Sequence, residues 1–396
     1  MKWRILAAAG AAAILLAACA RTDRPERADD PPFFAPVGPD RIRATDGRVY
    51  FDNLNARIAL LEERLEQRPS PALGRTLAQE LFHRFQIVRA VRDLEEADRL
   101  VVNALQSGKD SGAILLKARI DAAFHRFGAA LDRLDAIKVS EPSIEILRAE
   151  ILRAIGSEAM SGGRAGLPDF RSLAAEAQVE LDRGRLDAAM ARFHLAERSY
   201  AGASPFPLAW LHLQIGIGYL RYGRFDAAQA FFESALDRLP AYTPALDHLA
   251  ETLVARGRED RAIPIYLRLI EATGDPEFCG VLAEIERESG DDARSLDAEQ
   301  CAQDGFERLL SRHPQAYWQH AAEFYLSRGK VAEAYRLARL NLEHRQDVAS
   351  RVLMARVALA HDQAEEGCRI VAAIRAAGWA PPELREIDED RCASEP

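Results

Sequence analysis

The chain has 396 residues, of which 48% are hydrophobic and only 7% are aromatic. Alanine and leucine dominate the apolar residues, which favours helices packed through small side chains over a β-rich core. With 61 acidic residues against 52 Lys and Arg, the formal net charge is −9. An acidic chain repels phosphate backbones, so the composition argues against nucleic-acid binding.

The first residues follow the pattern of an export signal. Lys2 and Arg4 precede an apolar run over residues 5–18, which is shorter than the roughly 20 residues that a membrane-spanning helix needs. The run ends Leu-Ala-Ala and is followed by Cys19. This arrangement resembles the lipobox of bacterial lipoproteins, in which the cysteine is lipidated and becomes the first residue after cleavage. We therefore expect a lipoprotein signal peptide over residues 1–18 and lipidation of Cys19, with an ordinary secretory signal as the alternative.

The same resemblance implies a location. Stable attachment to a bilayer needs more than one acyl chain, and bacterial lipoproteins generally carry three. Ala20 stands where an aspartate often retains such proteins in the inner membrane. The resemblance therefore implies an outer-membrane lipoprotein that faces the periplasm. Residues 19–48 are expected to form a disordered, extended tether, because prolines alternate with charges between residues 25 and 39.

A repeat of about 34 residues follows, and its clearest unit runs from Ala209 to Tyr242. Places 8, 11, 15, 20, 24, 27 and 32 of this unit are Gly216, Tyr219, Gly223, Ala228, Phe232, Ala235 and Pro240. The pattern resembles the tetratricopeptide repeat, which folds as two antiparallel helices per unit. Small residues are needed at places 8, 20 and 27, where the two helices cross closely.

Five further units share the spacing and begin at Ser111, Phe170, Thr243, Gln315 and Val348. Each has Ala or Gly at places 8 and 20: Ala118 and Ala130, Ala177 and Ala189, Ala250 and Ala262, Ala322 and Ala334, and Ala355 and Gly367. Less regular helices are expected over residues 57–66, from about residues 77 and 145, and on both sides of a turn at residues 290–292. The register predicts an all-α, tetratricopeptide-like α-solenoid.

The expected domains follow from this register. A front solenoid covers residues 49–156, and a longer rear solenoid covers residues 169–382. Residues 157–168 between them are rich in glycine, which is typical of a hinge or of a surface insertion. Residues 383–396 are expected to form a capping helix, over residues 383–391, and a tail.

Four cysteines remain after Cys19, and an oxidising periplasm would pair them. Cys279 and Cys301 are each 11 residues from the turn residue Gly290, and Cys368 and Cys392 are each 12 residues from Ala380. Residues equidistant from the turn of an antiparallel hairpin lie at the same height, within disulfide reach. We therefore predict the disulfides Cys279–Cys301 and Cys368–Cys392, with buried, reduced cysteines as the alternative.

The sequence contains no recognisable catalytic or metal-binding motif. Its nine histidines lack the spacing of metal ligands, and there is no nucleophile elbow, phosphate-binding loop or convincing strand. Paired carboxylates occur at expected helix starts, where the helix dipole favours negative charge. We therefore predict a protein that is not an enzyme and holds no cofactor or metal.

In the repeats that this chain resembles, places 2, 5, 9, 12 and 13 commonly face a concave groove. These places predict a partner-binding groove formed by Trp210, Leu213, Ile217, Leu220, Arg221, Asp247, Glu251, Val254, Gln319, Glu323, Leu326, Val352, Arg356 and Leu359. Its front is apolar and its later parts are charged, which suits an amphipathic helix or an extended peptide.

The leading functional hypothesis is therefore a lipid-anchored periplasmic scaffold that binds envelope proteins or peptides. Lipoproteins with similar repeats serve envelope assembly, secretion, pilus or exopolysaccharide machinery, and the fold does not choose among these. A regulator that binds and activates a cell-wall enzyme is the alternative. An enzyme with an unrecognised site is a third hypothesis.

Overall fold

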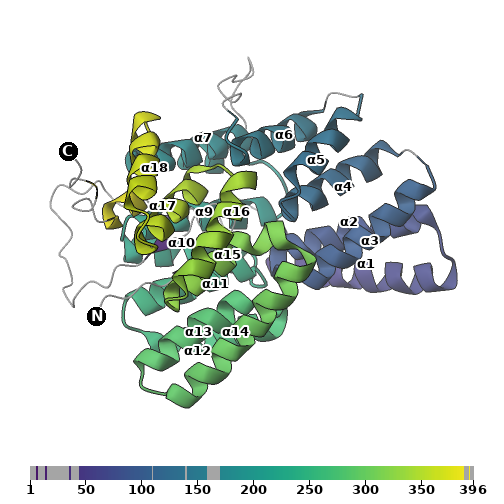
Figure 1. Cartoon of the computed structure of the whole chain (residues 1–396). Coiled ribbons are helices and arrows are strands. Elements are labelled where there is room, and N and C mark those ends of the chain that lie inside the picture. Colours follow the sequence, from purple (N-terminus) through teal and green to yellow (C-terminus); the bar gives the residue numbers. More distant parts are fainter. Residues whose placement is uncertain are drawn as a thin grey trace.

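The computed structural model describes residues 6–7, 14–15, 35–36, 44–108, 110–138, 141–157, 170–387 and 392. Within these residues the fold is all-α, with eighteen α-helices and one 3₁₀-helix, apart from two strands of two residues each. This confirms the predicted fold class (Figure 1). Cys19, most of the expected tether and all but the first residue of the expected 157–168 linker lie outside the described residues.

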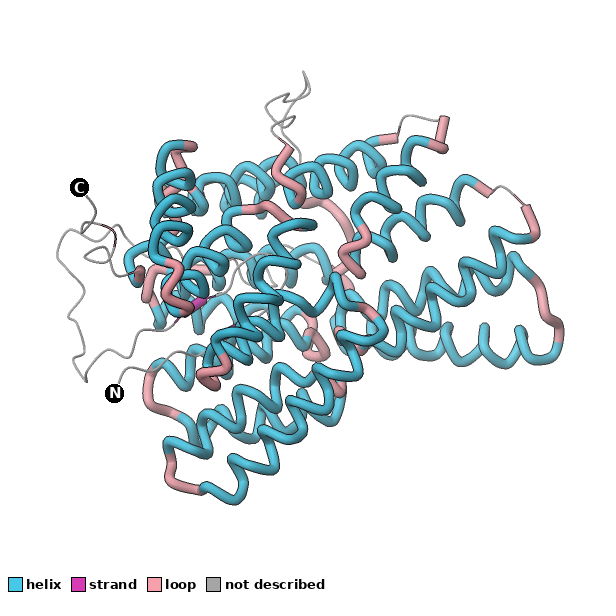
Figure 2. Tube along the Cα trace, viewed as in Figure 1, coloured by secondary structure: helices cyan, strands magenta, loops and turns pink. Residues whose placement is uncertain are grey.

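The helices form antiparallel pairs joined by short turns, as Figure 2 shows. The front array contains α1 Gly47–Gln67, α2 Pro71–Val88, α3 Val91–Gln106, α4 Ser111–Ala123, α5 Phe127–Asp135 and α6 Pro142–Ala154. The rear array contains α7 Phe170–Asp182, α8 Leu186–Ser199, α9 Phe206–Arg221, α10 Phe225–Arg238, α11 Thr243–Ala255, α12 Glu259–Thr273, α13 Pro276–Glu288, α14 Asp292–Arg312, α15 Pro314–Ser327, α16 Val331–His344, α17 Val348–Ala360 and α18 Ala364–Ala376. Every repeat unit expected from the sequence is a hairpin at the expected place.

The small residues at places 8 and 20 lie where the helices of a hairpin cross. All twelve of them are buried, and the ten alanines have no exposed surface. A Cβ atom at Gly216 would lie 2.4 Å from the ring of Phe232, and one at Gly367 would lie 3.0 Å from the carbonyl oxygen of Ala355. Larger side chains at these places would therefore force the two helices apart.

Place 15 lies in the turn between the two helices of each unit, where the backbone is left-handed. Four units have glycine there, with φ between 69° and 78° at Gly184, Gly223, Gly257 and Gly329. The other two units have His125 (φ 56°) and Asp362 (φ 59°). Residues with a Cβ atom pay a steric penalty in this conformation, so these two turns are the strained members of the series.

The rear array closes on itself through residues 378–387. Its first hairpin (α7 and α8) and its last (α17 and α18) are linked because the amide of Ala380 donates to the carbonyl of Asp182 at 2.9 Å. Gly184 is also required here, because a Cβ atom on it would lie 2.7 Å from the carbonyl oxygen of Ala380. The closing segment thus joins the two ends of the six hairpins into a ring, because Glu383 also accepts from Arg221 at the end of α9.

The closing segment differs from the predicted capping helix. Pro382–Glu386 forms the 3₁₀-helix η1 instead of an α-helix. The segment begins with Pro381 and Pro382, and 3₁₀ geometry is common in helices as short as these five residues. Residues 388–391 of the predicted helix lie outside the described residues. Leu384 and Ile387 are buried against α17 and α18, as the apolar side of a cap should be.

The front array lies across the N-terminal ends of the inner rear helices. Thr243 Oγ1, at the start of α11, donates to the carbonyl of Val88 at the end of α2 (2.7 Å). The amide of Gln346, just before α17, donates to the carbonyl of Ala154 at the end of α6 (2.8 Å). The last carbonyls of a helix lack intrahelical partners and carry partial negative charge, so meeting a helix N-terminus stabilises both ends. The front and rear arrays are therefore joined by contacts between their helix ends and not only by the chain that connects them.

Both predicted disulfides are present. Cys279 on α13 is bonded to Cys301 on α14, with Cα atoms 5.9 Å apart. Cys368 on α18 is bonded to Cys392, with Cα atoms 5.3 Å apart. The first bond joins the two helices of one hairpin, and the second ties the end of the closing segment to the last helix.

Two features differ from expectation near the amino terminus. Leu6–Ala7 and Ile14–Leu15 form the antiparallel strands β1 and β2, with Leu6 opposite Leu15, although the sequence offered no convincing strand. The first helix begins at Gly47 and not near residue 57, because Asp46 caps it by accepting hydrogen bonds from the amides of Arg48 and Val49.

The close helix crossing predicts a sharp contrast between two neighbouring alanines of α5. Ala130→Leu should lower the free energy of unfolding by about 1–3 kcal/mol, because the added methyl groups overfill a buried crossing. Ala129→Leu, one residue away on the exposed face, should change it by less than about 0.5 kcal/mol. Urea unfolding followed by circular dichroism measures both. Equal effects would contradict the assignment of place 20.

The strained turn at Asp362 predicts a stabilising substitution. Asp362→Gly should raise the free energy of unfolding by about 1 kcal/mol, because glycine adopts a positive φ without a steric penalty. Asp362→Ala keeps the Cβ atom and should bring no gain. Thermal unfolding of the two variants checks this, and a gain with alanine would show that the lost carboxylate, not the backbone, is responsible.

Candidate functional site: the inner wall of the ring

The first helix of each rear hairpin lies on the inside of the ring. In α9, α11, α13 and α17 most residues are buried, whereas the second helices keep an exposed face. Successive first helices also contact one another, as α9 does with α11 and α15 does with α13 and α17. We call the surface formed by α9, α11, α13, α15 and α17 the inner wall.

The residues predicted to line a groove all belong to the inner wall. Most of them are buried, and Trp210, Arg221 and Leu326 are partly exposed when the backbone is included. The burial has a source within the chain, because β1 lies against α11 and β2 lies against α9 and η1. Part of the chain's own amino-terminal segment therefore covers the predicted groove.

The α9 part of the inner wall is apolar. Leu213 and Ile217 are buried, and Trp210 packs near Phe170 of α7, with ring centroids 6.3 Å apart. These residues form an apolar surface along α9, the helix that β2 contacts. The predicted apolar character of this part of the wall is in keeping with these contacts.

Arg221, expected to face a partner, is held within the fold. Its guanidinium donates to the carboxylate of Glu383 through Nε (2.6 Å) and Nη2 (3.0 Å), and to Asp182 through Nη1 (3.3 Å). Although burial disfavours its charge, these two carboxylates raise the pKa of Arg221. Arg221 at the end of α9 therefore holds the closing segment through Glu383, and its exchange for glutamate would destabilise this contact.

The α11 part of the wall is acidic. Asp247 and Glu251 lie one helical turn apart, and 5% and 0% of their surface is exposed. Glu251 Oε2 lies 2.8 Å from His248 Nδ1, and Glu251 Oε1 has no hydrogen-bond partner among the described residues. Burial raises the pKa of both carboxyl groups well above the ordinary range. Both are therefore held in an environment that disfavours their charge.

Acidic side chains continue along the inner wall toward α15, and a positively charged side chain follows them. His320 Nδ1 lies 3.4 Å from Glu277 Oε2, and Glu323 on α15 is buried without a hydrogen-bond partner among the described residues. Beyond it, Arg345 pairs with Asp347 (2.6 Å) and contacts Gln319 Oε1 (3.3 Å). Arg345 and His320 were not predicted as wall residues, because they fall outside the places that normally face the groove. Glu277 was missed because no repeat register was predicted for its hairpin.

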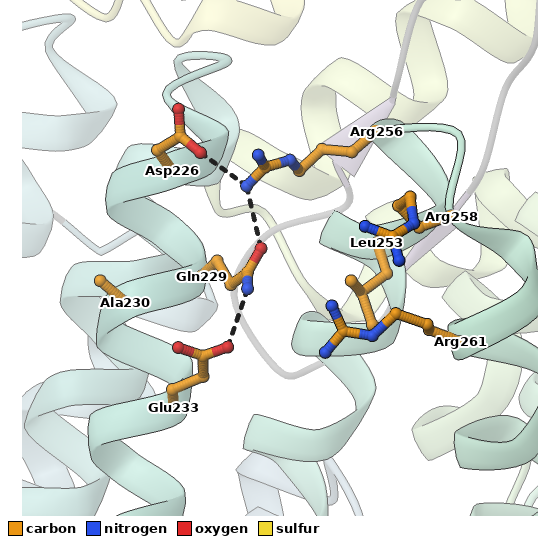
Figure 3. A pocket seen from close by; sticks show the side chains of 8 residues that line it. All are labelled: Asp226, Gln229, Ala230, Glu233, Leu253, Arg256, Arg258 and Arg261. Carbon is orange, nitrogen blue, oxygen red and sulfur yellow. Dashed lines mark hydrogen bonds and ion pairs between the residues drawn. The ribbon is translucent and has the colours of Figure 1, made fainter.

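Apart from the inner wall, the structure has a hollow between α10 and α12 (Figure 3). It has a volume of about 310 Å³, and arginines from the α11–α12 region face acidic and amide side chains of α10 across it. Arg256 bonds to Asp226 (2.6 Å) and Gln229 (2.9 Å), and Gln229 bonds to Glu233 (2.8 Å). These charged side chains are exposed, so water screens them and the contacts contribute little.

Neither a metal centre nor a membrane helix emerges from the described part of the chain. Its His, Cys, Asp and Glu side chains form no group of three or more arranged to hold a metal ion. No helix within it is both long enough and apolar enough to cross a bilayer.

The charges on the wall predict how stability responds to pH. The folded state keeps a proton on Glu251 above its ordinary pKa of 4.5, where the unfolded chain has released it, so this group lowers stability as the pH rises. Glu251→Gln should therefore raise the melting temperature at pH 8, and the gain should vanish toward pH 4. Differential scanning calorimetry across this range measures it.

Glu197 supplies the opposite control. It is also fully buried, but His212 lies 2.7 Å away, and hydrogen bonds from His194 and His212 overcome the effect of burial and lower its pKa to about 2. Glu197→Gln should therefore cost about 1–3 kcal/mol at pH 8. The same sign of effect for both glutamates would contradict the distinction between Glu197, which has two histidine donors, and Glu251, whose Oε1 has none among the described residues.

Comparison with known proteins supports the repeat assignment. Residues 219–285 match the tetratricopeptide repeat family. Among solved structures, the chain is similar to yeast Tom70 (14% identity, 86% of this chain and 92% of that chain covered, TM-score 0.28). It is also similar to the human IFIT1 dimer (15% identity, 82% of this chain and 68% of that chain covered, TM-score 0.36). A thermophilic TPR protein of Thermus thermophilus is similar as well (22% identity, 51% of this chain and 91% of that chain covered, TM-score 0.29). A search of curated proteins finds no match.

Proposed function

We propose that this tetratricopeptide-repeat chain is a lipid-anchored scaffold of the bacterial envelope, which binds partner proteins along the inner wall of its ring. The observation that carries the proposal is the inner wall itself. It combines an apolar surface on α9 with charged groups on α11 and α15, and proteins commonly recognise peptide segments on such mixed surfaces. Binding needs no chemistry from the chain, so the proposed scaffold is not an enzyme.

The proposed location rests on two separate features. Residues 1–19 have the order of a lipoprotein signal, and both disulfides are typical of an oxidising compartment such as the periplasm. Removal of residues 1–18 would also take β1 and β2 away from α9 and α11. Processing at Cys19 would therefore uncover the inner wall for a partner.

The anchor is tested by changing Cys19. In a Gram-negative host, Cys19→Ser should move the protein from the outer-membrane fraction to the soluble periplasmic fraction, because the acyl chains hold it to the membrane. Cys368→Ser, which removes a disulfide cysteine, is the control and should leave fractionation unchanged. Membrane attachment that survives Cys19→Ser would contradict lipid anchoring.

Partner binding is tested by affinity capture from detergent-solubilised envelopes. The tagged, lipidated chain should retain a defined set of envelope proteins, and Trp210→Ala should retain less because it removes apolar surface from the wall. Assembly or secretion components among the captured proteins support the scaffold. Cell-wall synthases or amidases would support the alternative, a regulator of a cell-wall enzyme, and no specific capture would contradict both.

A further inference from the structure

Unpaired buried carboxylates are concentrated on the inner wall. Most buried acids elsewhere in the described chain contact a cation: Asp121 lies 2.6 Å from Arg133 and also contacts Lys117, and Glu383 lies 2.6 Å from Arg221. On α11, in contrast, no described residue donates a hydrogen bond to Asp247 or to Glu251 Oε1. A buried carboxylate without a counter-charge is costly, so a fold gains nothing from two of them side by side.

The surroundings of this pair do not supply the missing charge. His248, on the same helix, contacts Glu251 and its charge also acts on Asp247, but burial lowers the pKa of this histidine and so disfavours its charged form. Tyr266, packed from α12, is fully buried and uncharged. The charges of Glu277 on α13 and of Asp275, the residue before α13, also act on Asp247, and they have the same sign as its own. Apart from His248, whose charged form burial disfavours, these groups around the pair are neutral or negative.

The position of the pair indicates the shape of its ligand. The helix that carries it is the one against which β1 lies, and the neighbouring α9 is in contact with β2. An extended backbone therefore fits along these two helices. Leu213 and Ile217 belong to α9, which contacts α11, and they offer apolar side chains on the same wall as the two carboxylates.

We propose that Asp247 and Glu251 form a recognition site for a lysine or arginine side chain, carried by an extended, otherwise apolar segment of the partner protein. The cation supplies the counter-charge that the fold omits, and Leu213 and Ile217 contact the apolar residues of the segment. This inference rests on the proposed function, since it names the chemistry of the partner. Glu323 on α15 adds a third carboxylate to the same wall, although the charges of His320 and Arg356 already act on it.

The test uses the lipidated chain, purified in detergent from a Gram-negative host, and three synthetic peptides. Each peptide has the sequence of residues 5–15, the run that contains β1 and β2, with Gly10 replaced by lysine, by norleucine or by glutamate. Fluorescence anisotropy measures the affinities. The lysine peptide should bind about tenfold or more tightly than the glutamate peptide, with the norleucine peptide between them.

The variant Asp247→Asn/Glu251→Gln isolates the charge. It should bind the lysine peptide no better than the norleucine peptide, while its melting temperature stays at or above that of the parent chain. Asp226→Asn/Glu233→Gln, which neutralises two exposed carboxylates at the hollow between α10 and α12, is the matched control and should keep the full preference for lysine.

Three results would overturn the proposal. Equal binding of the lysine and glutamate peptides would do so, as would a preference for lysine that survives in the Asp247→Asn/Glu251→Gln variant. Calorimetric binding of Ca²⁺ or Mg²⁺ that disappears in this variant would assign the carboxylates to a metal ion instead. None of these results bears on the scaffold itself, because capture of envelope proteins is measured separately.

Discussion

The structure depends on how closely the two helices of each hairpin cross. Alanine or glycine at places 8 and 20 lets the helices pack with no exposed surface between them, as at Ala250 and Ala262. Close crossing gives every hairpin nearly the same shape, so successive hairpins repeat the same small rotation. Five such steps lead from the first hairpin to the last, and the closing segment then links the two ends.

The ring is completed by contacts that no single repeat contains. The amide of Ala380 donates a hydrogen bond to the carbonyl of Asp182, and the carboxylate of Glu383 accepts one from the guanidinium of Arg221. The front array then lies across one end, where the C-terminal carbonyls of α2 and α6 meet the N-terminal ends of α11 and α17. Opposite helix ends attract, so this arrangement fixes which end of the inner wall is covered.

The sequence predicted the hairpins well and the closure poorly, for a physical reason. Helix pairing depends on residues less than 34 positions apart, so small residues at Ala118 or Ala355 reveal it, and so does the equal distance of Cys279 and Cys301 from Gly290. Ring closure depends on curvature summed over six hairpins, and Arg221 and Glu383 are separated by 162 positions. No local pattern marks such a pair. The candidate wall residues lie on the expected helices, but Arg221 is held by the closing segment and β1 and β2 cover part of the surface.

Hydrogen–deuterium exchange of the intact chain tests ring closure, and with it the existence of an enclosed wall, most directly. The amide of Ala380 donates to Asp182, and that of Gln346 donates to Ala154, and neither bond lies within a helix. The account predicts that both amides exchange as slowly as those of α9, and that Glu383→Gln speeds exchange at Ala380 but not at Gln346. Fast exchange at Ala380 in the unmodified chain would show an open array, which would contradict the account.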